Sequence, residues 1–128
     1  MPATFAPDWL AEPTDVNELA TKVWPRRTTR DDSGEITIGG TTASALVAQY
    51  GTPVLVLDEQ EIRDRAAETV AAFTDAAATH NAGVTVYYAG KAFLSTHIAR
   101  WMTEAGLNVD VCSGGELAVA LAAGIAPE

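Results

Sequence analysis

The chain has 128 residues, of which 48% are apolar and 20% charged, a balance typical of a globular domain. Eight basic and seventeen acidic side chains give a formal net charge of −9, which argues against nucleic acid or an anionic membrane as a partner. The single cysteine, Cys112, excludes an intramolecular disulfide. No apolar run approaches the roughly 20 residues that span a bilayer, and the N-terminus lacks the features of a signal peptide. We therefore expect a soluble cytoplasmic protein.

The first third of the chain shows little regular pattern. Residues 1–34 contain four prolines and a turn-like Asp-Asp-Ser-Gly sequence, and we expect them to be irregular. A short strand is predicted at residues 35–38 and a short helix over residues 42–50. Gly51 stands where a helix would end in a left-handed conformation, and Pro53 cannot continue that helix.

From Pro53 onward, strand-like and helix-like segments alternate. Short apolar or β-branched runs predict strands at residues 54–57, 84–89 and 108–112. Helices are predicted at residues 59–79, 95–105 and 115–123, the first of them capped by Asp58 with Glu61 able to complete a capping box. This order indicates an α/β fold built from βαβ units around a parallel sheet.

Lys91 is the first candidate for chemistry, because active sites of parallel α/β folds gather at the carboxyl ends of the strands. It ends an apolar strand and has no charged neighbour within several residues. An amine held there would be desolvated and a good nucleophile toward an aldehyde. A lysine that extends its ammonium into solvent is the structural alternative, and spacing alone favours that alternative.

The residues after the third predicted strand form the second candidate. Ser113-Gly114-Gly115 opens a helix and either lets a ligand approach the backbone or forms a tight turn, with Ser113 and Glu116 as a capping box. The turn is the preferred interpretation of these residues alone. Asp110 is expected to face away from its apolar neighbours, where a carboxylate needs a partner that is either functional or structural.

The remaining reactive residue types give weaker signals. Cys112 is expected on the same face as Asp110, and such a cysteine more often packs than reacts. His80 and His97 are far apart in the sequence and have no partners at the spacing of metal ligands. A metal site is therefore not expected.

Three segments, in this order, resemble a known family. Residues 50–58 (YGTPVLVLD) are similar to the lead-in of the fold-type III, alanine-racemase-like decarboxylases that depend on pyridoxal phosphate. Residues 88–93 (YAGKAF) resemble their Tyr-Ala-x-Lys-Ala/Cys cofactor motif, and residues 110–117 (DVCSGGEL) resemble the strand and turn that follow it. The Ser-Gly-Gly-Glu-Leu form is similar to the branch that acts on diaminopimelate rather than on ornithine or arginine. Trp24-Pro25-Arg26 and the long extension around it look like the actinobacterial version.

The resemblance implies a cofactor, a reaction and a site. Lys91 would hold pyridoxal 5'-phosphate, and Asp110 and Glu116 would be further cofactor-binding residues that position the ring and the lysine. The reaction would be decarboxylation of meso-2,6-diaminopimelate to L-lysine, the last step of lysine biosynthesis, in a homodimer. The alternatives are another basic amino acid as the substrate, a racemisation, or a non-catalytic cofactor-binding or interaction module.

The resemblance also implies a larger fold than this chain holds. Residues 47–128 would supply the first βα units of a cofactor-binding (β/α)₈ barrel, a fold of about 250 residues. Residues 1–46 would form an N-terminal extension that joins a C-terminal β-domain. The family's phosphate-binding loop and its later cysteine and tyrosine motifs have no counterpart in this sequence, so the isolated 128-residue polypeptide is expected to be inactive.

Overall fold

The computed structural model describes residues 14–127, and the chain divides into two compact units, Met1–Thr52 and Pro53–Glu128. The predicted irregular structure of residues 1–13 lies outside the described residues. The predicted domain boundary between residues 46 and 47 stays a prediction.

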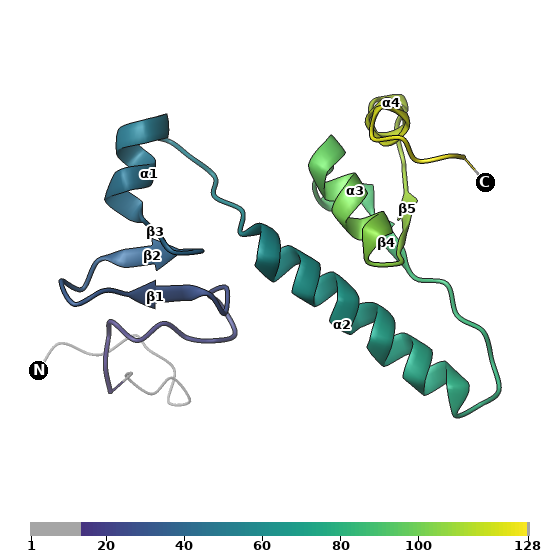
Figure 1. Ribbon diagram of the computed structural model, residues 1–128, viewed down its shortest axis with the longest axis horizontal. Coiled ribbons are helices and arrows are strands. Elements are labelled where there is room, and N and C mark those ends of the chain that lie inside the picture. The colour runs from purple at the N-terminus through teal and green to yellow at the C-terminus, as the bar shows by residue number, and fades with distance from the viewer. Residues whose placement is uncertain (1–13, 128) are drawn as a thin grey trace, which may run out of the picture. The chain divides into compact units, whose positions relative to one another are not determined.

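The first unit holds a small antiparallel sheet and one helix (Figure 1). The sheet has the order β1 (Thr28–Arg30), β2 (Ile36–Ile38) and β3 (Thr41–Thr42), and α1 (Ala43–Tyr50) follows it directly. The strand predicted at residues 35–38 and the helix predicted at residues 42–50 are confirmed. The irregular structure predicted for residues 28–30 is wrong, because these residues pair with β2.

A tight turn explains why β1 forms. Asp31 accepts hydrogen bonds through one carboxylate oxygen from the backbone N–H groups of Ser33 and Glu35 and from the Ser33 hydroxyl, at 2.9, 3.0 and 2.6 Å. The Ser33 hydroxyl and the Glu35 amide, in that order, lower the pKa of Asp31. Gly34 has a φ of 84°, which favours glycine. The turn-like Asp-Asp-Ser-Gly sequence therefore joins two paired strands.

The second unit contains the alternating elements that the sequence predicts. In chain order these are α2 (Glu59–Ala78), β4 (Tyr87–Ala89), a 3₁₀ turn (η1, Gly90–Ala92), α3 (Thr96–Glu104), β5 (Asn108–Asp110) and α4 (Gly114–Ala122). Strands β4 and β5 are parallel, with Tyr88 opposite Val109 and Ala89 opposite Asp110. The predicted parallel βαβ unit, with α3 as its connecting helix, is confirmed.

The strands are shorter than predicted, and the first of them is missing from this unit. Residues 54–57 form no strand, and Leu55 is 78% exposed. In the part of the chain that the structure describes, no strand pairs with this segment. A strand requires such a partner, because its backbone N–H and C=O groups need hydrogen bonds. The predicted buried strand at residues 54–57 is therefore wrong for this structure, although the helix that follows it is confirmed.

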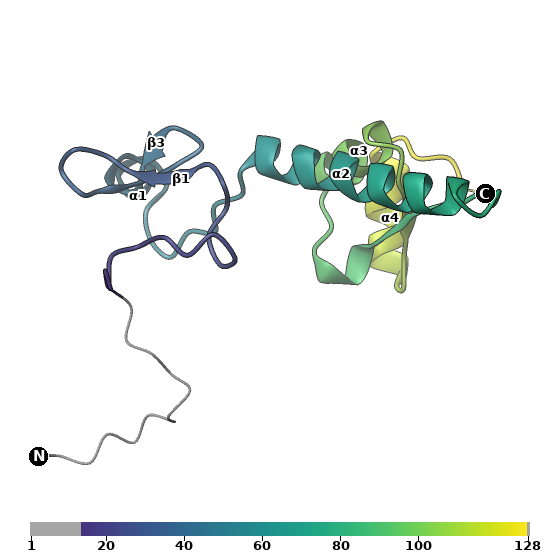
Figure 2. The ribbon, with the colours of Figure 1, turned by 90° about the horizontal axis from the view of Figure 1, so that it is seen from below.

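The core of the second unit lies where α2 and α3 meet the two strands. Its buried members are Ala66 from α2, Ile98 and Met102 from α3, and Leu107, which precedes β5. Helix α3 contacts α2, α4 and β5, and Figure 2 shows the three helices gathered in this unit. On the surface Arg63 joins α2 to α3: it pairs with Glu104 and its guanidinium lies 5.5 Å from the Trp101 ring centre. None of the helices described at residues 14–127 is long and apolar enough to cross a membrane.

Candidate functional site

The predicted site residues gather at one edge of the parallel strand pair. Because β4 and β5 run in the same direction, their carboxyl ends meet at the same edge. Strand β4 leads there into η1, which carries Lys91. Strand β5 ends there at Asp110 and leads into α4, which carries Glu116 in its first turn.

Gly90 makes the closest contact between the two strand ends. A Cβ atom built on Gly90 would lie 2.9 Å from the Asp110 carbonyl oxygen, 3.3 Å from a Leu94 methyl carbon and 3.6 Å from a Glu116 carboxylate oxygen. The first of these distances is too short for a real side chain. The backbone just before Lys91 therefore lies directly against the end of β5, and only glycine fits there without a shift.

Glu116 fixes the turn between β5 and α4. Its carboxylate accepts a hydrogen bond from the Cys112 backbone N–H at 2.7 Å, and its own N–H donates to the Ser113 hydroxyl at 3.2 Å. In the predicted capping box, the Glu116 carboxylate accepts a hydrogen bond from the Ser113 N–H. In the structure, the carboxylate accepts instead from the N–H of Cys112, one residue earlier. Added Cβ atoms at Gly114 and Gly115 would have ample room. The hydrogen bond to Ser113 and this open space support the turn interpretation of Ser113-Gly114-Gly115.

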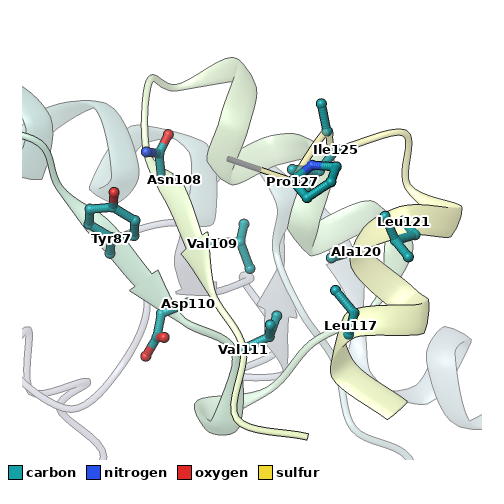
Figure 3. A pocket seen from close by; sticks show the side chains of 11 residues that line it. Tyr87, Asn108, Val109, Asp110, Val111, Leu117, Ala120, Leu121, Ile125 and Pro127 are labelled. Carbon is teal, nitrogen blue, oxygen red and sulfur yellow. The ribbon is translucent and has the colours of Figure 1, made fainter. Parts of the chain in front are cut away.

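Asp110 points out of the strand pair into solvent. Figure 3 shows its carboxylate on the opposite side of β5 from Val109 and Val111, which face α4, so the predicted alternation is confirmed. The side chain is exposed and has no hydrogen-bond or ion-pair partner within residues 14–127. The expectation that this carboxylate needs a protein partner is wrong for this structure, because the exposed carboxylate is solvated by water.

Lys91 is likewise exposed, and its amine is free of hydrogen bonds and ion pairs among the described residues. The predicted desolvation of this amine is therefore wrong for this structure, because the Lys91 side chain is exposed to solvent. The structure places Gly90, the residue before Lys91, close to Asp110 and Glu116. It does not bring the Lys91 amine to either carboxylate.

Tyr88, the first residue of the YAGKAF segment, is a residue of this edge to which the sequence interpretation gave no role. Its hydroxyl donates to the Phe93 carbonyl oxygen at 2.6 Å, across the turn that contains Lys91. Its ring packs against the core, and burial raises the pKa of the Tyr88 hydroxyl. Besides the motif itself, the signal in the sequence is a tyrosine on the inward-facing position of a strand, where its hydroxyl needs a polar partner.

Two hollows flank the strand pair. The larger, of about 640 Å³, is lined mostly by apolar side chains of α2, β4 and α3 and by Leu55 and Leu57. The smaller, of about 320 Å³, lies between β5 and α4 and includes Asp110 at its rim (Figure 3). Lys91 lines neither hollow. Within the described residues no cluster of three or more metal-ligating side chains occurs.

The sequence of this chain matches known proteins over most of its length. The family described as "Pyridoxal-dependent decarboxylase, pyridoxal binding domain" matches residues 61–128, which is more than half of the chain. Relatives named diaminopimelate decarboxylase include one from Mycobacterium leprae (strain TN), 48% identical over 98% of this chain and 25% of the relative. Another, from Mycobacterium bovis, is 51% identical over 86% of this chain and 23% of the relative. A third, from Corynebacterium efficiens, is 42% identical over 84% of this chain and 22% of the relative.

The matched part includes most of α2 and both strands of the parallel pair, and so it includes Lys91, Asp110 and Glu116. The chain spans about a quarter of the length of these curated relatives. The extent of the family match, together with the parallel βαβ unit that it covers, shows that the chain belongs to the pyridoxal-dependent decarboxylases and corresponds to part of their pyridoxal-binding domain.

Proposed function

We propose that the complete protein is a pyridoxal-phosphate-dependent decarboxylase that converts meso-2,6-diaminopimelate to L-lysine and carbon dioxide. The observation that carries the proposal is the free, exposed amine of Lys91, carried by η1 at the carboxyl edge of β4 and β5, where the preceding Gly90 lies against the end of β5. The names of the relatives support the choice of diaminopimelate as the substrate.

The residues at this edge fit the chemistry of the cofactor. An aldehyde needs an accessible primary amine, and the Lys91 amine is exposed and without a protein partner in the described part of the chain. A cationic ring nitrogen or ammonium group is stabilised by a nearby carboxylate, and Asp110 offers an exposed carboxylate at the same edge. When bound, pyridoxal phosphate supplies an electron sink for the electron pair left behind as carbon dioxide departs.

Each protein group then has a distinct task in our proposal. Lys91 binds the cofactor covalently through its Nζ atom. Asp110 holds positive charge at the site, either on the ring or on the lysine. Glu116 acts through the backbone, because its carboxylate is already engaged by the Cys112 N–H, and it keeps the end of β5 in place against Gly90.

The proposal extends to the architecture of the complete protein. The parallel β4–α3–β5 unit supports a (β/α)₈ barrel, in which residues 47–128 supply the first βα units and residues 1–46 the extension that joins a C-terminal β-domain. We propose a cytoplasmic homodimer that takes a small-molecule substrate. The net charge of −9 supports the absence of nucleic acid and membrane partners.

Covalent labelling tests the role of Lys91, and Lys22, the other lysine of the 128-residue chain, serves as the control. The complete protein is loaded with pyridoxal phosphate, reduced with borohydride to fix the cofactor on its lysine, digested and mapped by mass spectrometry. We expect the label on the peptide that contains Lys91, and we expect Lys91→Ala to abolish it while Lys22→Ala retains it. A label that survives Lys91→Ala rejects this assignment.

The substrate is tested separately with the unmodified complete protein. We expect L-lysine and carbon dioxide from meso-diaminopimelate, and no comparable carbon dioxide release from ornithine or arginine. Faster decarboxylation of ornithine or arginine, or racemisation without release of carbon dioxide, would leave the cofactor assignment intact and overturn the substrate. A protein that binds the cofactor and turns over none of these compounds would be a binding module.

A further inference from the structure

The turn that carries Lys91 is closed by a single side chain. Residues 90–92 form the 3₁₀ turn η1, and Phe93 is extended, with φ near −178°. The Tyr88 hydroxyl reaches from β4 across this turn to the Phe93 carbonyl oxygen at 2.6 Å. The hydrogen bond therefore closes a ring over residues 89–92, and Lys91 lies inside the closed segment.

The donor of this hydrogen bond is firmly placed. The Tyr88 ring packs against the core formed by Ala66, Ile98, Met102 and Leu107, and the opposite strand places Val109 beside it. Burial raises the pKa of Tyr88 above its usual value of 10, so the hydroxyl keeps its proton and its donor role through neutral and mildly alkaline pH. The closure is thus anchored in the rigid part of the unit.

The other end of the turn is anchored by Gly90. Its backbone lies so close to the Asp110 carbonyl that a Cβ would come to 2.9 Å. The segment is therefore held at Gly90 by packing and at Phe93 by the hydrogen bond from Tyr88. Because the Lys91 side chain has no partner of its own within residues 14–127, the backbone between these two anchors decides where the amine can reach.

We propose that Tyr88 is a positioning residue for Lys91: its hydroxyl holds the η1 turn so that the lysine amine is presented at the carboxyl edge of the strands. The inference rests on the proposed function of Lys91 as the cofactor-binding lysine. Tyr88 acts through the Phe93 backbone and is not assigned a contact with cofactor or substrate. Loss of the hydroxyl should loosen the turn and slow the attachment of the cofactor while leaving the core in place.

The test compares Tyr88→Phe with Tyr50→Phe in the complete protein. Each variant removes one tyrosine hydroxyl, and that of Tyr50 belongs to an exposed side chain at the end of α1. In the cofactor-free protein, hydrogen exchange of peptides covering residues 89–94 should be on the order of fivefold faster in Tyr88→Phe, the size expected for one net hydrogen bond. The rate at which the visible absorption of bound pyridoxal phosphate develops after its addition should fall, and Tyr50→Phe should match the wild type in both measurements.

A second pair of variants examines the other anchor and protects the test against a Tyr88→Phe protein that fails to fold. Gly90→Ala places a methyl group against the Asp110 carbonyl, whereas Gly114→Ala adds one in open space. We expect slower cofactor attachment in Gly90→Ala and no change in Gly114→Ala. Equal rates in Gly90→Ala and Gly114→Ala would count against anchoring of the turn.

The outcomes separate this inference from the proposed function. If Lys91→Ala abolishes the covalent label but Tyr88→Phe behaves like Tyr50→Phe in exchange and in attachment rate, Lys91 keeps its role and the positioning role of Tyr88 is overturned. If the label survives Lys91→Ala, the role of Lys91 fails, and with it the positioning role, whatever the exchange data show.

Discussion

The Glu116 carboxylate accepts a hydrogen bond from the Cys112 backbone N–H at 2.7 Å, four residues earlier in the chain. Cys112 lies in the short connection between β5 and α4, and Glu116 lies in the first turn of α4. A negative charge at this end of a helix is also stabilised by the helix dipole. One side chain therefore joins the end of a strand to the start of the next helix, at the edge where the candidate site lies.

Removal of this carboxylate should destabilise the second unit. We expect Glu116→Ala to lower the free energy of unfolding by about 1–2 kcal/mol, because it leaves the Cys112 N–H without its charge-assisted acceptor. Glu116→Gln keeps an acceptor and should cost less than half as much. Urea unfolding of the cofactor-free complete protein measures both, with the exposed Asp75→Ala of α2 as the control. Equal stability of Glu116→Ala and Asp75→Ala would contradict a stabilising role of this hydrogen bond.

The N-cap of α3 gives a second prediction. The Ser95 hydroxyl accepts a hydrogen bond from the Ile98 N–H at 3.2 Å, and α3 contributes three buried residues to the second unit. We expect Ser95→Ala to lower the free energy of unfolding by about 1 kcal/mol and Ser95→Asp to retain most of it, since aspartate is an equally good cap. Thermal unfolding of the cofactor-free protein distinguishes them. A Ser95→Asp protein as unstable as Ser95→Ala would show that the cap contributes little.

The helices of this chain could be predicted because their signals are local. Asp58, Ser95 and Ser113 each cap a helix in the structure, and a cap is set by a few consecutive residues. Strands depend on a partner elsewhere in the chain. Residues 54–57 are as apolar as a buried strand yet have no partner in the described structure, whereas Thr28–Arg30 pairs with β2 despite its polar sequence.

The place of the candidate site residues at one edge could be predicted from the sequence, but their arrangement there could not. Alternation of strands and helices was enough to place Lys91, Asp110 and Glu116 at one edge of the parallel pair. The exposure of Lys91 depends on what surrounds the turn, which its sequence neighbours do not reveal. The contact between Gly90 and Asp110 joins two segments that are far apart in the sequence. To predict it, the register of β4 against β5 must be known.

The C-terminal end of α3 provides a third prediction. Gly106 has a φ of 92°, and it donates its N–H to the Thr103 carbonyl, while Leu107 donates to the Met102 carbonyl, at 3.0 Å in both cases. These paired bonds form a Schellman motif that sends the buried Leu107 into the core. We expect Gly106→Ala to lower the free energy of unfolding by about 1–2 kcal/mol, because a side chain is strained at positive φ.

Gly83→Ala is the matched control for Gly106→Ala. Gly83 does not have a positive φ, and an added Cβ there would meet nothing within 4 Å. We expect its stability to equal or slightly exceed that of the wild type, since alanine restricts the unfolded chain more than glycine does. Urea unfolding compares the two variants directly. Equal effects of the two substitutions would be evidence against the strain argument.

The raised pKa of Tyr88 predicts a loss of stability at alkaline pH. Burial keeps this hydroxyl protonated in the folded protein above its usual value of 10, whereas the unfolded chain ionises at that value. Between pH 10 and the folded pKa, the unfolded state therefore binds fewer protons than the folded state. The stability that Tyr88 contributes is complete below pH 10 and is lost as the pH rises through the folded pKa, with a slope of at most about 1.4 kcal/mol per pH unit.

Tyr88→Phe isolates this effect, because phenylalanine has no group that ionises. We expect the unfolding free energy of the wild type to fall more steeply between pH 9 and 11 than that of Tyr88→Phe. Tyr50→Phe, which removes an exposed hydroxyl at the end of α1, serves as the control. Chemical unfolding at a series of pH values measures all three proteins. If Tyr88→Phe has the same slope as Tyr50→Phe, burial does not hold the proton on Tyr88, and the donor of the Phe93 hydrogen bond is lost at the same pH as any exposed tyrosine.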